Sequence, residues 1–119
     1  MNKEKSKIFF DKAKKMMPGG VNSPVRAFIS VNDNPFFVKR AKGAYIYDVD
    51  GNSYLDYVAS WGAIILGHAD SGLIKEVIDA LENGTSFGAC HPNEIELAKL
   101  ITEAFPSIEL LRLTSSGTE

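Results

Sequence analysis

The last part of the chain joins an apolar segment to a polar turn, and this combination restricts the possible folds. The segment Ile108–Leu113 is rich in branched apolar residues and predicts a buried strand. The residues that follow, 115–119 (SSGTE), are typical of a turn at which a strand passes into a helix. The first turn of a helix offers unpaired backbone N–H groups that bind phosphate, and hydroxyl groups can add hydrogen bonds. We therefore expect Ser116, Gly117 and Thr118 to bind a phosphate group.

The expected strand also bears on the size of the protein. A strand buried on both faces of a sheet normally has parallel neighbours. The rest of the sequence predicts only short antiparallel strands, and the helix expected after Thr118 lies beyond the last residue of the sequence. We therefore expect the chain to be a truncated part of a larger α/β protein.

Charge and cysteine content narrow the class of protein. The sequence has 13 basic and 15 acidic residues, a net charge of −2, which argues against a nucleic-acid or membrane-surface partner. The single cysteine, Cys90, cannot form an intramolecular disulfide, as is usual in a reducing compartment. The N-terminus has no signal-peptide pattern, and no apolar run is long enough to cross a bilayer. We expect a cytoplasmic protein.

Periodicity and turn residues predict the elements of the first half. Residues 3–17 have an amphipathic helical pattern, which ends at residues 18–20 (PGG). Residues 36–57 predict a three-stranded antiparallel meander, with strands at 36–40, 44–48 and 53–56 and turns at 42–43 (KG) and 50–51 (DG). Between the predicted helix and meander, residues 18–35 predict an irregular segment.

Three polar residues in the meander resemble the start of a calcium loop, but the resemblance fails. Asp48, Asp50 and Asn52 alternate as calcium ligands do, whereas Ser53 stands where such a loop needs glycine and Ala59 where it needs glutamate. These residues therefore predict an ordinary turn.

Two helices are predicted in the second half. Residues 71–82 place their apolar side chains on one face, with Asp70 or Ser71 as the N-cap. A second helix is predicted from Glu94 to about Ala104, with Asn93 and Glu96 as a capping box.

Four single residues are candidates for binding or structural roles. Arg26 follows the rigid Pro24, so it is either a carboxylate ligand on a constrained loop or a solvated charge. Trp61, flanked by small residues, is either part of the core or the wall of a pocket. His68 is expected to be a hydrogen-bonded structural histidine, and His91 lacks the neighbours of a zinc ligand.

Several stretches resemble one enzyme family. Residues 43–52 (GAYIYDVDGN) and 54–57 (YLDY) are similar to the N-terminal meander of the class III aminotransferases, which are fold-type I pyridoxal-phosphate enzymes. Within this class, the chain resembles the glutamate-1-semialdehyde 2,1-aminomutases in four places: 20–28 (GVNSPVRAF), 60–62 (SWG) with 65–68 (ILGH), 84–89 (GTSFGA) and 116–119 (SGTE). The resemblance extends over essentially the whole chain and over roughly the first quarter of the family's usual length. Ser115 departs from the usual Asn, and Cys90-His91 from the frequent Pro-Thr, without loss of a group with a chemical role.

The resemblance implies a fold and a division of the chain. The implied fold class is α/β: an N-terminal helix and a small three-stranded antiparallel meander, which lead into the first helices and strand of a fold-type I large domain. Residues 1–57 are then the N-terminal segment, and residues 58–119 are the incomplete start of the cofactor-binding domain.

The resemblance also assigns roles to residues. It implies that Ser116, Gly117 and Thr118 bind the phosphate of pyridoxal 5′-phosphate or pyridoxamine 5′-phosphate. Ser23 and Arg26 match the site for the substrate carboxylate, and Trp61 matches an aromatic wall of the substrate pocket. Residues 85–87 match a loop near the active site and the subunit interface. No catalytic residue is expected in this chain, because the family's cofactor-bearing lysine lies farther along the sequence.

The implied activity is an isomerisation. The family converts glutamate-1-semialdehyde to 5-aminolevulinate, a tetrapyrrole precursor, by amino transfer within one molecule. The implied partners are a second copy of the intact protein, as a homodimer, and the tRNA reductase that supplies the substrate. The 119 residues alone are expected to be inactive.

Two other functions remain open at this point. The first is an ω-aminotransferase of the same class, which passes the amine to an external keto acid; the sequence around Arg26 argues against it. The second is a non-catalytic interaction module that binds a partner through its apolar helix or an unpaired strand edge.

Overall fold

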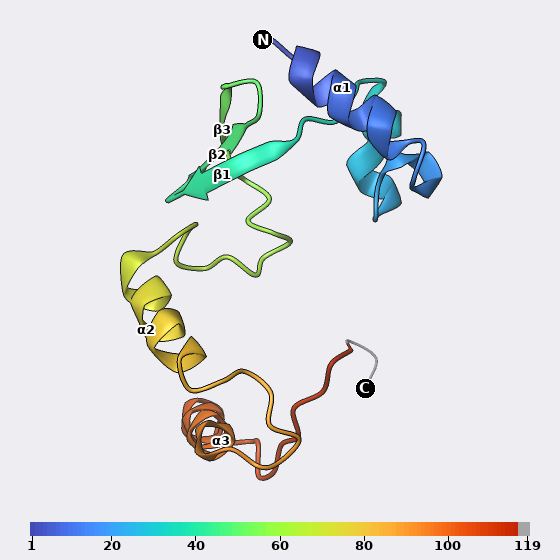
Figure 1. The fold of residues 1–119 in the computed structure, drawn as a ribbon. Coiled ribbons are helices and arrows are strands. Elements are labelled where there is room, and N and C mark those ends of the chain that lie inside the picture. Colours follow the sequence, from blue (N-terminus) through green and yellow to red (C-terminus); the bar gives the residue numbers. More distant parts are fainter. Residues whose placement is uncertain (117–119) are drawn as a thin grey trace. The chain divides into compact units, whose positions relative to one another are not determined.

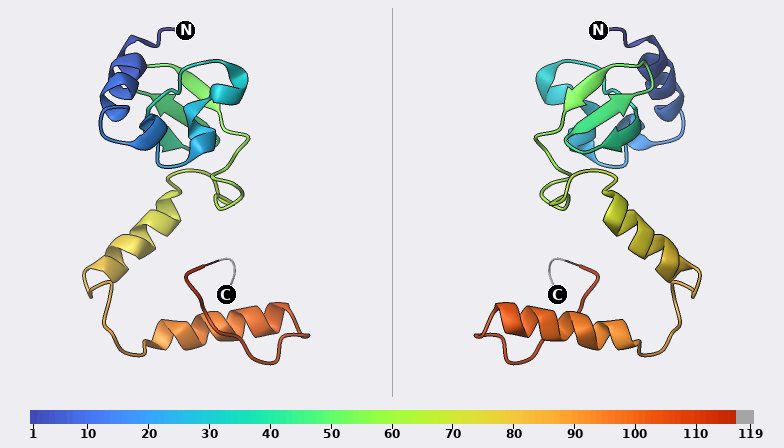
Figure 2. Two further views of the ribbon diagram at one scale, coloured as in Figure 1. Left: turned by 90° about the vertical axis from the view of Figure 1, so that its right-hand side faces the viewer. Right: turned by 90° about the vertical axis from the view of Figure 1, so that its left-hand side faces the viewer.

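The computed structural model describes residues 1–116, which form two units, Met1–Val77 and the residues from Ile78 onward. Figure 1 shows the elements in chain order, from helix α1 through a three-stranded sheet to helices α2 and α3. In the first unit, α1, the short helical turns of residues 18–31 and the sheet lie side by side in both views of Figure 2.

Helix α1 (Glu4–Ala13) is formed around one buried face. Ser6, Phe10 and Ala13 are buried on this face, at helical spacing. The predicted helix is confirmed to Ala13, after which the chain continues in turns to Met17. Gly20 then lies against α1 with a φ of +75°. A Cβ atom at this position would lie 2.7 Å from the Phe10 ring. Only glycine fits there.

The predicted meander is confirmed, with small changes in the first strand. Strands β1 (Val38–Lys42), β2 (Tyr45–Asp48) and β3 (Ser53–Leu55) pair antiparallel in the order β1-β2-β3. The first strand begins and ends two residues later than predicted, and its pairing contains an irregularity between Val38 and Arg40.

The turn between β2 and β3 is held by Asp48. Its carboxylate accepts hydrogen bonds from the N–H groups of Asp50 (3.0 Å) and Asn52 (2.7 Å) and from the Tyr54 hydroxyl (2.9 Å). The interpretation of this segment as a turn is therefore confirmed. In the part of the chain that the structure describes, no group of three His, Cys, Asp or Glu side chains is placed to hold a metal ion.

The same turn holds the start of α1. The Asp50 carboxylate accepts hydrogen bonds from the N–H groups of Lys5 (2.7 Å) and Ser6 (2.9 Å) and from the Ser6 hydroxyl (2.6 Å). The Ser6 hydroxyl also accepts from the N–H of Phe37 (3.3 Å). A carboxylate from the meander thus satisfies N–H groups that the first turn of a helix leaves unpaired.

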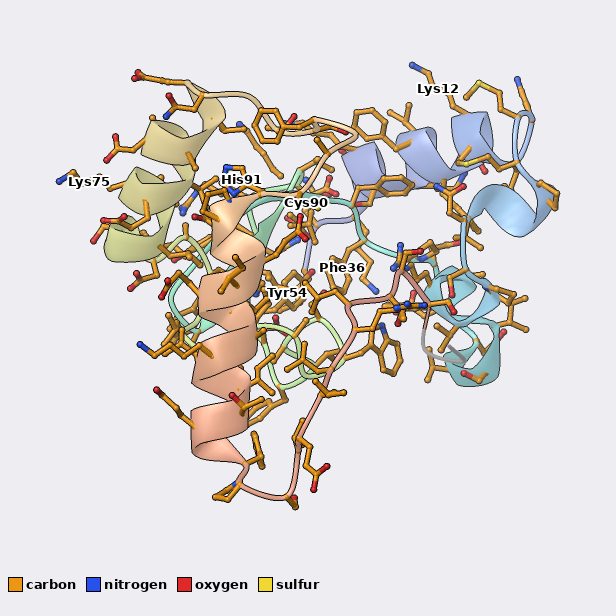
Figure 3. All side chains as sticks on the ribbon, turned by 90° about the horizontal axis from the view of Figure 1, so that it is seen from below. Lys12, Phe36, Tyr54, Lys75, Cys90 and His91 are labelled. Atoms are coloured by element: carbon orange, nitrogen blue, oxygen red, sulfur yellow. The ribbon has the colours of Figure 1, made fainter. Side chains whose placement is uncertain are left out.

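Aromatic side chains connect residues 18–35 to the sheet. Phe28 packs edge-on against Phe36, with ring centroids 5.7 Å apart. Phe36 stacks on Tyr54 of β3, with ring centroids 4.6 Å apart; both residues are labelled in Figure 3. The irregular segment, which contains three short 3-10 turns, is therefore fixed to the sheet.

Both helices predicted in the second half are present. Helix α2 (Ser71–Leu81) begins at the predicted cap, where the Asp70 carboxylate accepts from the N–H of Leu73 (2.9 Å). Helix α3 (Pro92–Ala104) begins earlier than predicted, and the predicted capping box of Asn93 and Glu96 is wrong. The cap is His91, with Glu94 as its partner, because Pro92 lacks an N–H and suits the first helical position.

The predicted strand at residues 108–113 is not formed. The segment has no regular secondary structure, and the described part of the chain contains a single sheet, made of β1, β2 and β3. A strand needs a neighbour to receive its backbone hydrogen bonds, and within residues 1–116 none lies beside this segment.

Among the described residues, the buried apolar side chains Phe10, Ala13 and Ala27 form a small core beside α1. The large apolar residues of α2, which spans the boundary between the units, are 43–54% exposed: Leu73, Ile74, Val77, Ile78 and Leu81. Within the described residues, no helix has both the length and the apolar character needed to cross a membrane.

Candidate functional site

Arg26 lies on a short turn that is anchored at both ends. Residues Pro24–Ala27 form a 3-10 turn, in which the N–H of Arg26 donates to the carbonyl of Ser23 (3.0 Å). Ala27 is buried, and the next residue, Phe28, packs against Phe36 in the left-handed conformation. The Arg26 side chain is exposed, and no ion pair among residues 1–116 engages it. The turn therefore presents a guanidinium group from a fixed backbone, with Ser23 at its start.

Trp61 lies on a left-handed turn outside the core. Ala59, Ser60, Trp61 and Gly62 all have φ between +48° and +90°. The Trp61 side chain is 72% exposed, so the interpretation of Trp61 as a core residue is wrong for the described part of the chain. A flat aromatic surface on a constrained turn is suited to contact a ligand.

Two side chains that flank this turn bind each other. The Asp56 carboxylate lies 2.6 Å from the Nε2 atom of His68, and its other oxygen accepts from the N–H groups of Val58 (2.9 Å) and Ala59 (3.0 Å). The hydrogen bond from His68, supported by those from the two N–H groups, lowers the pKa of Asp56. The prediction that His68 is a hydrogen-bonded structural histidine is confirmed.

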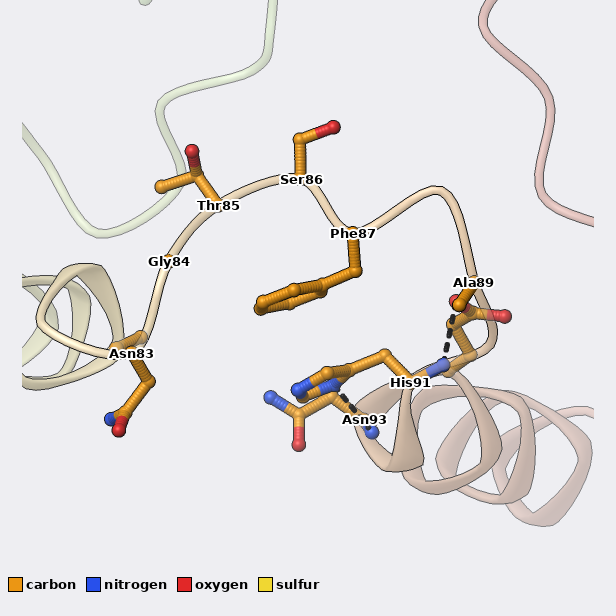
Figure 4. A pocket seen from close by; sticks show the side chains of 10 residues that line it. Asn83, Gly84, Thr85, Ser86, Phe87, Ala89, His91 and Asn93 are labelled. Atoms are coloured by element: carbon orange, nitrogen blue, oxygen red, sulfur yellow. Dashed lines mark hydrogen bonds between the residues drawn. The ribbon is translucent and has the colours of Figure 1, made fainter.

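The second unit contains a pocket of about 560 Å³ beside the N-terminus of α3, shown in Figure 4. The Phe87 ring stacks on the His91 ring, with centroids 5.2 Å apart and planes inclined by 9°. The Nδ1 atom of His91 accepts a hydrogen bond from the backbone N–H of Asn93 (3.2 Å). The backbone N–H of His91 donates to the Glu94 carboxylate (3.1 Å). Thr85 and Ser86 add hydroxyl groups to the lining.

The predicted phosphate turn lies mostly outside the described residues. Ser116 is described and exposed, and its carbonyl accepts from the Thr114 hydroxyl (3.2 Å). Gly117 and Thr118 are outside the described residues. Of the predicted site residues, the structure brings Ser23 and Arg26 together in one turn. Trp61 lies on a separate loop of the first unit, and Ser116 belongs to the second unit.

Sequence reasoning missed two sets of contacts. The hydrogen bonds that Asp50 accepts from N–H groups of α1 join residues 44 and 45 positions apart, for which the sequence carries no local signal. The Asp56–His68 pair spans 12 positions. The sequence signal that could have predicted this pair is the presence of Asp56 and His68 at the two ends of one irregular segment.

Comparison with known proteins identifies the family. The family model for class-III aminotransferases matches residues 28–119. The chain is 59% identical over 116 residues to glutamate-1-semialdehyde 2,1-aminomutase 2 of Bacillus licheniformis, covering 98% of this chain and 27% of that protein. It is 58% identical over 119 residues to glutamate-1-semialdehyde 2,1-aminomutase of Thermodesulfovibrio yellowstonii, covering 100% and 28%. The chain thus spans about a quarter of the length of the curated relatives it matches.

Solved structures show the same fold. An omega-transaminase from Sphaerobacter thermophilus superposes with a TM-score of 0.87 and 36% sequence identity; the match covers 95% of this chain and 25% of the transaminase chain. A transaminase with pyridoxal phosphate bound superposes with a TM-score of 0.88 and 35% identity; the match covers 99% of this chain and 27% of the transaminase chain. The described elements therefore form part of an α/β fold of the transaminase type. The match of the family model over residues 28–119 shows that the chain belongs to the class-III aminotransferase family.

Proposed function

We propose that these residues are the N-terminal part of a glutamate-1-semialdehyde 2,1-aminomutase, which converts glutamate-1-semialdehyde to 5-aminolevulinate. The observation that carries the proposal is the identity of 58–59% to aminomutases over 98–100% of this chain. The identity to the two transaminases of known structure described above is 35–36% over a similar span. The conversion moves an amino group within one molecule, so substrate and product are isomers and no external amine is consumed.

The donor groups of the chain suit the phosphate of pyridoxal or pyridoxamine phosphate. The resemblance assigns this phosphate to Ser116, Gly117 and Thr118, which include two hydroxyl-bearing side chains. Backbone N–H groups and hydroxyl groups commonly bind phosphate where a chain enters a helix. The bound cofactor supplies the electron sink that amino transfer requires.

The residues of the first unit suit the binding of a short substrate with a carboxylate. The Arg26 guanidinium can form two parallel hydrogen bonds with a carboxylate, and the Ser23 hydroxyl at the start of the same turn can add a third. Trp61 offers a flat wall along the carbon chain. A substrate fixed in this way by its carboxylate end holds its reacting carbons in a constant position, which lowers the entropic part of the barrier.

The proposal extends to the setting of the enzyme. We assign residues 1–57 to the N-terminal segment and residues 58–119 to the start of the cofactor domain. The intact protein is proposed to be a cytoplasmic homodimer in tetrapyrrole biosynthesis, which receives its substrate from a tRNA reductase. The 119 residues alone are proposed to be inactive.

An ω-aminotransferase is the second candidate, favoured by the structural match to the Sphaerobacter thermophilus enzyme.

The experiment that distinguishes the two functions uses the complete polypeptide that contains these residues. Loaded with cofactor, it is given glutamate-1-semialdehyde alone, or an amine together with an external keto acid. Formation of 5-aminolevulinate in the first reaction is the expected result. Amino transfer only in the second reaction would establish the ω-aminotransferase instead.

A further inference from the structure

The segment between residues 57 and 67 is closed at both ends by backbone hydrogen bonds to adjacent residues. The N–H of Asp56 donates to the carbonyl of Ala44 (2.8 Å). His68 and Gly43 exchange two backbone hydrogen bonds, each 2.8 Å. The two ends of the segment that carries Trp61 are therefore attached beside each other, at the hairpin that joins β1 to β2.

The side chains of the same two residues make a second closure. The distance from Asp56 Oδ2 to His68 Nε2 is 2.6 Å, and these side chains are only 9% and 19% exposed. An ionised carboxylate can only accept a hydrogen bond, so Nε2 of His68 carries the hydrogen. A partly buried, charge-assisted hydrogen bond of this kind is stronger than one between neutral groups.

Asp56 also directs the chain into the left-handed turn. Its Oδ1 atom accepts from the N–H groups of Val58, which precedes this turn, and of Ala59, its first residue. Three consecutive residues other than glycine, Ala59, Ser60 and Trp61, have φ between +48° and +62°. This conformation is unfavourable for such residues and persists only where the surroundings impose it.

From these contacts we propose that Asp56 and His68 are positioning residues, which hold the indole of Trp61 at the place where it orients the substrate. This inference rests on the proposed function, because it takes Trp61 as a wall of the substrate pocket. Asp56 fixes the start of the segment and His68 its end, so a change at His68 reaches Trp61 through the segment between them. Neither residue needs to touch the substrate.

The test compares variants of the complete, cofactor-loaded protein labelled with 5-fluorotryptophan. Trp61 is the single tryptophan of these 119 residues, and the loss of its signal in Trp61→Phe assigns its fluorine resonance. His68→Leu removes the donor to Asp56 and is expected to shift or broaden this resonance. It is also expected to lower kcat/KM about tenfold. His68→Gln places an amide donor near the position of Nε2 and is expected to restore both values.

A double-mutant cycle separates positioning from a general structural role. If His68 acts through Trp61, then Trp61→Ala with His68→Leu lowers kcat/KM no further than Trp61→Ala alone, within about twofold. Asp11→Asn is the control, since it breaks exposed ion pairs with Lys7 and Lys14 in the same unit and leaves the Trp61 resonance unchanged. If His68→Leu is not recovered as folded protein, His68→Phe replaces it, because a phenyl ring fills similar space and offers no hydrogen-bond donor to Asp56.

The outcomes distinguish this inference from the proposed function. A Trp61 resonance in His68→Leu or His68→Phe that coincides with the wild-type signal would overturn the inference. The inference would also be overturned if the reductions of kcat/KM caused by His68→Leu and by Trp61→Ala multiply in the double variant. If Trp61→Ala leaves kcat/KM unchanged, the role of Trp61 in the proposed function fails, whereas a shifted resonance in His68→Leu still supports the positioning of Trp61.

Discussion

Arg26 is suited to bind a carboxylate because of its neighbours in the chain. The sequence allowed two interpretations, a solvated charge or a ligand, since Pro24 restrains only one side of the turn. The structure adds the buried Ala27 and the ring contact between Phe28 and Phe36, which fix the other side. A guanidinium on such a turn loses little backbone freedom when it binds its ligand.

The first prediction concerns the charge and shape of this residue in the complete enzyme. Arg26→Ala is expected to lower kcat/KM for glutamate-1-semialdehyde by about 10²–10³, because two charge-assisted hydrogen bonds are lost. Arg26→Lys keeps the charge but lacks the planar pair of donors, so its kcat/KM is expected to lie between the values of Arg26→Ala and the wild type. Arg40→Lys, on a β1 residue whose guanidinium lies over the Tyr47 ring, is the control and should change kcat/KM less than about twofold. Equal rates for Arg26→Ala and wild type would contradict the assignment.

The second prediction concerns Gly20, where a side chain has no room. Gly20→Ala combines a φ of +75° with a contact of 2.7 Å to the Phe10 ring. Gly19→Ala has a similar φ of +67°, with its nearest neighbour at 4.0 Å. Gly20→Ala is therefore expected to lower the free energy of unfolding by about 1–3 kcal/mol more than Gly19→Ala. Thermal unfolding of the two variants measures the difference, and equal midpoints would show that no clash occurs.

At the scale of elements, hydrogen bonds to Asp50 join α1 to the meander. Sequence patterns predicted both elements, because helical periodicity and hairpin turns are local signals. They could not predict that Asp50 would bind the start of α1, since that contact depends on how the elements pack. For the same reason the strand at residues 108–113 was predicted and is not formed. Its apolar pattern is local, but its hydrogen-bond partner must come from elsewhere in the chain.

The third prediction tests the contact between Asp50 and α1. Asp50→Ala is expected to speed hydrogen exchange in residues 4–13 of the complete protein about tenfold, because N–H groups of the first helical turn lose their acceptor. Asp79→Asn, on the exposed helix α2, is the matched control. If exchange in α1 is unchanged in Asp50→Ala, the contact contributes nothing to the stability of the helix.

The fourth prediction concerns acid. Burial alone would raise the pKa of Asp48, but hydrogen bonds from Asn52, Tyr54 and the Asp50 N–H outweigh it and lower the pKa below its usual 3.8. A carboxyl group with a lowered folded-state pKa stabilises the fold above pH 3.8, and this contribution is lost as the pH falls through the lowered value. Hydrogen exchange of the β2–β3 turn is therefore expected to rise relative to the rest of the first unit below pH 3.8. In Asp48→Asn, the hydrogen exchange of this turn should depend less on pH. If the pH dependence is unchanged in this variant, it arises from groups other than Asp48.

At the scale of the whole molecule, the apolar side chains of different elements differ in exposure. Phe10, Ala13 and Ala27 are buried, whereas the apolar faces of α2, which spans the boundary between the two units, and of α3 are largely exposed in the described residues. The sequence motifs identified the family and the candidate site residues, since they depend on local chemistry. They did not place Ser23, Arg26 and Trp61 relative to one another, because that depends on how distant parts of the chain pack.

The number of turnovers without an external acceptor tests the central claim most directly. The complete protein, loaded with the amine form of the cofactor, is mixed with an excess of glutamate-1-semialdehyde, and 5-aminolevulinate is counted per active site. An aminomutase regenerates its amine in each cycle, so we predict many equivalents of product per site. A transaminase without an external partner stops after at most one amino group per site, and that result would contradict the account.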